Sequence, residues 1–69
     1  MVGDLIKKHL SERGIKQTYI AKAIGIENNV FSMMLNNKRK ITAEEYFRIC
    51  KAIGINAEYF ADQYKEENN

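Results

Sequence analysis

"QTYIAKAIGIENNVFSMML", residues 17–35 of this 69-residue chain, is the stretch that decides the fold. In its first half, Ile20 and Ile24 share one helical stripe, and Gly25 follows where a helix commonly ends. This pattern predicts a helix over residues 17–24.

The second half of the stretch returns to helical spacing after a very short turn. Phe31, Met34 and Leu35 recur at that spacing and predict a helix over residues 28–35. Two short helices that cross steeply need a small side chain where their backbones approach, and Ala21 provides it. The stretch therefore predicts two short helices packed across each other.

The flanking sequence predicts three further helices. Apolar residues at helical spacing indicate a first helix of about three turns that ends at Gly14. Thr42 and Glu45 form a T-x-x-E capping box that begins a fourth helix, which Gly54 ends. Asn56 is placed to cap a fifth, shorter helix. We therefore expect an all-α chain with a compact five-helix fold.

The composition fits one small helical domain. Hydrophobic residues make up 45% of the chain and charged residues 29%, and there is no proline to interrupt a helix. A chain this short holds a single core. We assign residues 1–64 to one domain and residues 65–69 to a polar C-terminal tail.

Several classes of protein are disfavoured. A single cysteine, Cys50, and a single histidine, His9, leave no internal disulfide and no zinc cluster, so we expect neither a metal nor a cofactor. The sequence contains neither a nucleophile–base pair nor a phosphate-binding glycine loop, so we do not expect an enzyme. No apolar run approaches the roughly 20 residues of a membrane span, and no signal peptide is evident. We expect a cytoplasmic protein without a membrane partner.

The charge is divided unevenly along the chain. The net charge is +2, but residues 1–60 hold ten bases and six acids, whereas residues 61–69 hold three acids and one base. A basic body of this kind is compatible with a phosphate-binding face.

Three segments together resemble the Xre/Cro family of transcriptional regulators. "IKQTYIAKAIGI" is similar to the second helix and turn of that family, "NKRK" to its basic loop, and "YFRICKAIGIN" to its fourth helix and the exit from it. The resemblance covers nearly the whole chain. It implies a lambda-repressor-like domain in which the helices at residues 17–24 and 28–35 form a helix-turn-helix that binds double-stranded DNA.

The resemblance places the outer face of the helix at residues 28–35 in the major groove. The implied base-contacting residues are Asn28, Asn29, Ser32 and Met33. An asparagine amide can bond adenine N6 and N7 together, and a methionine side chain offers apolar contact to a thymine methyl group. A half-site that favours A·T pairs is therefore expected.

A second group of residues is expected on the DNA backbone. The resemblance assigns a phosphate contact to the first residue of the second helix. It also places the basic triplet, residues 38–40, just beyond the helix at residues 28–35, where it would lie over the sugar-phosphate backbone. The expected phosphate-contacting residues are Lys16, Gln17, Asn36, Lys38, Arg39 and Lys40.

Two positions depart from the family pattern. Lys16 and Glu27 stand where the family usually has Ser, Thr or Asn as helix caps. Lys16 can serve a phosphate instead. Glu27 could accept a hydrogen bond from a cytosine amino group or disfavour wrong sites, and its role stays open.

The leading hypothesis is a Cro-like repressor that binds a pseudo-palindromic operator as a homodimer. One module buries too little DNA for strong selectivity, so pairing is expected at least on DNA. By resemblance the dimer surface includes Ile55, Asn56 and Tyr59, and no small-molecule ligand is expected.

Two alternatives remain open. The first is an antitoxin or plasmid-maintenance regulator that binds both DNA and a protein partner. The second is a protein-interaction module that has lost DNA binding, which would favour a neutral or acidic face in place of the amides and the three bases.

Overall fold

The structure is a computed structural model, and it describes the backbone of residues 2–67 and the side chains of residues 2–63. The described residues form five helices and no strand. Their bounds are α1 Val2–Arg13, α2 Gln17–Ile24, α3 Asn28–Leu35, α4 Ala43–Ile53 and α5 Glu58–Glu67. The expected all-α, five-helix fold is confirmed over the described residues.

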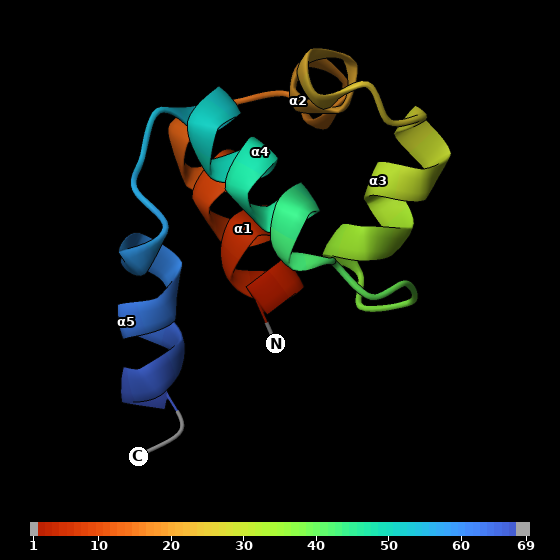
Figure 1. Cartoon of the computed structure of the whole chain (residues 1–69). Helices are drawn as coiled ribbons and strands as arrows, with labels where there is room; N and C mark the ends of the chain where they lie inside the picture. Colours follow the sequence, from red (N-terminus) through yellow and green to blue (C-terminus); the bar gives the residue numbers. More distant parts are fainter. Residues whose placement is uncertain (1, 68–69) are drawn as a thin grey trace.

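The helices pack pairwise around one core. Helix α1 packs against α3 and α5, and α2 packs against α3 and α4. In Figure 1, α3 and α5 lie on opposite sides of α1 and α4, and α2 bridges α4 and α3. Every helix contributes buried side chains to the core: Leu5, Ile6, Leu10, Ile20, Ala21, Ile24, Phe31, Met34, Leu35, Ile49, Cys50 and Phe60.

The predicted turn between α2 and α3 depends on Gly25. This residue has a φ of 73°, a left-handed conformation that glycine adopts without a Cβ penalty. The Ile26 N–H donates to the Ala21 carbonyl (3.0 Å), and the Gly25 N–H donates to the Lys22 carbonyl (3.2 Å). These are the two bonds of a Schellman ending, so the chain can leave α2 and enter α3 within three residues.

Helix α3 ends in the same way without a glycine. Asn37 is the one described non-glycine residue with a positive φ, 60°. The Lys38 N–H then donates to the Met33 carbonyl (2.8 Å). Asparagine tolerates this conformation better than most residues, so Asn37 sets the direction in which the basic triplet leaves the helix.

The predicted capping box begins α4. The Thr42 hydroxyl accepts from the Glu45 N–H (3.1 Å), and the Glu45 carboxylate accepts from the Thr42 N–H (2.9 Å). Further along α4, the Tyr46 hydroxyl donates to the Ala57 carbonyl and ties the helix to the connection that follows it.

The start of the fifth helix differs from the prediction. Helix α5 begins at Glu58, one residue later than a side-chain cap at Asn56 requires, and Asn56 instead offers its carbonyl to the Tyr59 N–H (3.2 Å). The helix has ten residues and reaches Glu67, so its backbone enters the segment at residues 65–69 that was expected as a tail. The side chains of this segment lie outside the described residues.

Candidate nucleic-acid interface

Helix α3 has two faces of opposite character. Phe31, Met34 and Leu35 are fully buried, and they fix the helix to the body. Asn28 and Asn29 are exposed in its first turn. The helix is therefore held rigidly by one side while it presents polar side chains on the other.

The remaining base-contact candidates lie further along the same helix. Met33 is 42% exposed, although it is apolar, and Ser32 is half-buried. The structure thus brings all four predicted base-contacting residues onto one short helix. Asn28, Asn29 and Met33 have the greater access to a partner.

Neither residue that precedes the two helices acts as a side-chain cap. Lys16 has an extended backbone conformation at its cap position and Glu27 has a φ of −58° and a ψ of 144°, and neither side chain makes a capping hydrogen bond. Both side chains are exposed, and the adjacent Gln17 is half-buried at the first position of α2. Lys16 is therefore available for a phosphate, as its sequence position suggested.

The C-terminal end of α3 is clamped to α1. The Asn36 amide donates to the Ser32 carbonyl (2.8 Å) and accepts from the Lys7 ammonium (2.6 Å). The Asn37 amide donates to the Asp4 carboxylate (2.7 Å). Two side chains of α1 thus hold the turn that follows α3, and the amide of Asn36 is already occupied within the fold.

The clamp depends on a close approach that only glycine permits. A Cβ atom on Gly3 would lie 2.5 Å from the Met34 carbonyl oxygen and 2.8 Å from the Asn37 side-chain oxygen. Helix α1 can therefore bring its first turn against the end of α3 because residue 3 has no side chain.

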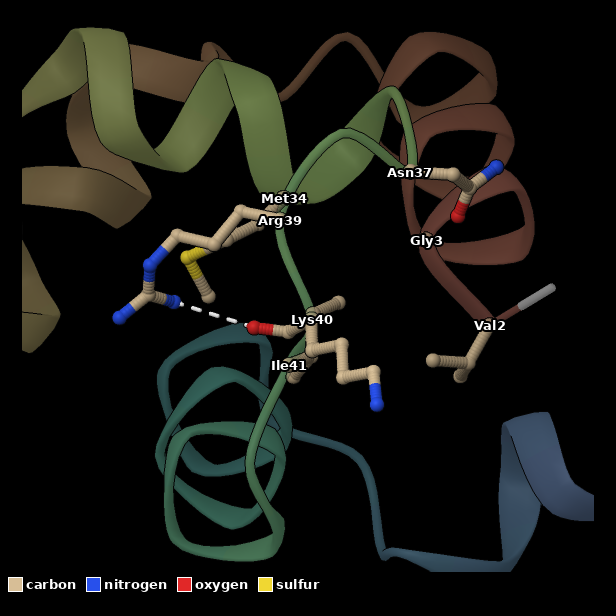
Figure 2. A pocket seen from close by; sticks show the side chains of 7 residues that line it. All are labelled: Val2, Gly3, Met34, Asn37, Arg39, Lys40 and Ile41. Atoms are coloured by element: carbon tan, nitrogen blue, oxygen red, sulfur yellow. Dashed lines mark hydrogen bonds between the residues drawn. The ribbon is translucent and has the colours of Figure 1, made fainter.

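The basic triplet leaves this clamped end. Lys38, Arg39 and Lys40 are all exposed. Arg39 and Lys40 border an open cavity of about 410 Å³, which Figure 2 shows together with its other lining residues, Val2, Gly3, Met34, Asn37 and Ile41.

Arg39 is already paired within the protein. Its guanidinium makes two parallel bonds to the Glu45 carboxylate, 3.1 Å from Nη1 to Oε1 and 3.0 Å from Nη2 to Oε2. Together with the Thr42 N–H, Arg39 lowers the pKa of Glu45 to about 2, and the pair raises the pKa of Arg39. The two residues form a bidentate ion pair at the start of α4.

The expected dimer residues follow α4. Ile55 is half-buried, Asn56 is exposed and Tyr59 is 36% exposed. The Tyr59 ring packs edge-on against His9, with 5.4 Å between ring centroids. Phe47 on α4 is 57% exposed and was not predicted as part of any interface.

Sequence reasoning also missed Gly3, Asn37 and the partner of Arg39. Gly3 could have been noticed as a glycine inside a helical pattern, and Asn37 as an asparagine just after a helix end. Nothing in the spacing alone indicated that Glu45 both takes part in the capping box of α4 and pairs with Arg39.

A comparison with protein families identifies the fold. The model of a helix-turn-helix family matches residues 6–60, which include α2, α3 and α4 completely. The chain belongs to this helix-turn-helix family. It is therefore a DNA-binding regulator of the Xre and lambda-repressor type. No significant match was found among curated proteins or among solved structures.

Two further findings concern other classes of partner. Within the described part of the chain, no three His, Cys, Asp or Glu residues gather as a metal-binding group. None of the described helices is long and apolar enough to span a bilayer.

Proposed function

We propose that this helix-turn-helix protein is a cytoplasmic transcriptional repressor that binds a pseudo-palindromic operator in double-stranded DNA as a homodimer. The observation that carries the proposal is the exposed first turn of α3. Asn28 and Asn29 stand free there, while Phe31 and Met34 anchor the same helix in the core. A rigid helix with amides on its outer face is suited to reading base edges in a major groove.

The residue types on this face favour A·T pairs. An asparagine amide makes a bidentate contact to adenine N6 and N7, and each good contact of this kind discriminates by about 1–3 kcal/mol. The exposed apolar surface of Met33 suits a thymine methyl group. Ser32 supplies a hydroxyl that can bond several bases. Glu27, exposed beside Asn28, would disfavour close phosphates and accept from a cytosine amino group.

Phosphate contacts would come from both ends of the motif. Lys16 and Gln17 stand at the start of α2, and Lys38 and Lys40 follow α3. Asn36 is the weakest of the proposed phosphate contacts, because its amide is already bonded to Ser32 and Lys7. Repression would follow from occupancy of the operator, and these contacts supply salt-sensitive affinity.

The proposal is tested by selecting bound sequences from a random duplex pool at near-physiological salt. We expect enrichment of an A·T-rich palindrome. Asn28→Ala should relax one base position in each half-site, whereas Lys38→Ala should weaken every site and reduce the salt slope by about 1. Lys51→Ala, which removes an exposed lysine from the last turn of α4, is the charge-matched control. The proposal fails if the wild-type protein enriches no sequence.

A further inference from the structure

The loop between α3 and α4 is fastened at three points. Asn37 holds its first end through the bond to Asp4, and Ile41 is half-buried at its other end. Between them, the Arg39 guanidinium donates two hydrogen bonds to Glu45, six residues further along the chain, and one to the Lys40 carbonyl (3.2 Å). The middle of the loop is therefore held by one side chain.

Glu45 is a well-prepared partner for that side chain. Its carboxylate is 16% exposed and accepts from the Thr42 N–H as well as from the arginine, so helix formation in α4 already fixes its position. Arginine is the cation that matches a fixed carboxylate with two parallel bonds, because its planar fork has the same spacing. The pair is part of a network rather than an isolated surface contact.

The other two bases of the triplet are in a different state. Among the residues that the structure describes, neither Lys38 nor Lys40 has a side-chain hydrogen bond or an ion pair. Figure 2 shows the Arg39 and Lys40 side chains leaving the loop in different directions, with the Arg39 guanidinium turned away from the Lys40 ammonium. One base of the triplet is used inside the protein, and two are free.

We propose that Arg39 and Glu45 form a latch that positions the basic loop, and that Lys38 and Lys40, rather than Arg39, bind the phosphates. Glu45 is then a positioning residue for DNA binding, although it touches no DNA itself. This inference rests on the proposed function and revises the expectation that Arg39 grips the backbone.

The latch would act by ordering the loop before DNA arrives. An unlatched loop would lose conformational freedom on binding, at a cost comparable to fixing one or two side chains. Breaking the latch should therefore weaken operator binding by about two- to tenfold. The number of phosphate contacts would be unchanged, so the salt slope should stay the same.

The test compares single variants of both partners by operator affinity at several salt concentrations. Arg39→Lys keeps the charge but loses the fork, and Glu45→Gln keeps the capping box, in which glutamine is also accepted. Glu44→Gln removes the same charge from the neighbouring exposed position and is the matched control. We expect Arg39→Lys to bind about two- to tenfold more weakly than wild type, and Glu45→Gln to bind more weakly than Glu44→Gln by the same factor.

Two further variants complete the comparison. The double variant with Arg39→Met and Glu45→Gln should bind the operator no more weakly than Arg39→Met alone, because either change by itself already breaks the Arg39–Glu45 pair. A direct phosphate contact by Arg39 predicts the opposite results. Arg39→Lys would then keep nearly full affinity, Glu45→Gln would bind more tightly than Glu44→Gln, and Arg39→Met would reduce the salt slope by about 0.9. Any of these outcomes overturns the latch.

A measurement without DNA separates the latch from the proposed function. In the free protein, NMR titration should show the pKa of Glu45 rising from about 2 towards its ordinary value in Arg39→Met. An unchanged Glu45 titration refutes the latch alone. If the wild-type protein binds no duplex while Glu45 does respond, the proposed function is refuted, and with it the role of the latch in DNA binding.

Discussion

His9 is a buried imidazole with aromatic neighbours. Its ring meets the rings of Tyr59 and Phe60 edge-on, at centroid distances of 5.4 Å and 5.5 Å. Burial, assisted by the charge of Arg13 and opposed by Glu12, lowers the pKa of His9 below 6.5. The unfolded chain therefore binds a proton at a higher pH than the folded chain does.

This difference gives a pH dependence with a defined sign. The stability associated with neutral His9 is fully present above about pH 6.5 and decreases as the pH falls from there to the folded pKa. We expect urea denaturation to show a loss of unfolding free energy over that window, and NMR titration to place the pKa of His9 below 6.5. His9→Leu should remove that loss. A wild-type protein whose stability stays flat as the pH falls from 6.5 through the pKa of folded His9 would contradict the prediction.

At the scale of elements, local signals predicted most of the helix bounds. The structure has α2 at Gln17–Ile24 and α3 at Asn28–Leu35, as the spacing indicated, because apolar periodicity and a glycine ending specify such helices locally. The capping box of α4 is equally local, since its two residues are one turn apart. The same periodicity separated the buried and outer faces of α3.

The contacts that could not be predicted connect distant elements. Gly3 lies against the Met34 carbonyl, although the two residues are more than thirty positions apart in the sequence, and Asp4 accepts a hydrogen bond from Asn37. Their partners follow from how α1 packs on α3, which periodicity does not specify. Arg39 and Glu45 are closer in sequence, but their pairing depends on the path of the irregular loop that joins them, which helical periodicity does not specify. These tertiary constraints shape the C-terminal end of α3.

Helix α1 should therefore limit where α3 can sit. Gly3→Ala would place a methyl group against the Met34 carbonyl, and either α1 or the end of α3 must move. Overpacking of this kind costs about 1–3 kcal/mol, whereas the gain in helix propensity is at most about 1 kcal/mol. We expect a net loss of unfolding free energy of up to about 2 kcal/mol by urea denaturation, and weaker operator binding.

The control for this change is Ser11→Ala, which alters an exposed position of the same helix. It should leave both the unfolding free energy and the operator affinity within about 0.5 kcal/mol of wild type. If Gly3→Ala were as stable as wild type and bound DNA equally well, the close approach would not position α3.

At the scale of the whole molecule, the proposed dimer requires a self-complementary surface. In a two-fold dimer the same patch meets itself, so a charge added near the axis faces its own copy. The proposed patch consists of Ile55, Asn56 and Tyr59, and Asn56 is exposed in the single chain. A substitution there can disturb pairing while the core of each subunit stays intact.

We therefore expect Asn56→Lys to separate pairing from DNA recognition. Two lysines across the axis repel each other, and like charges in an interface cost several kcal/mol, so the ratio of full-operator to half-site affinity should fall about tenfold or more. Ser11→Lys adds the same charge on α1 and should leave the ratio unchanged. The ratio isolates pairing, because a general effect of charge on DNA affinity changes both sites alike. Sedimentation of the protein–operator complex gives the number of subunits directly. One subunit on the full operator, or an equal ratio in both variants, would exclude this surface from dimerisation.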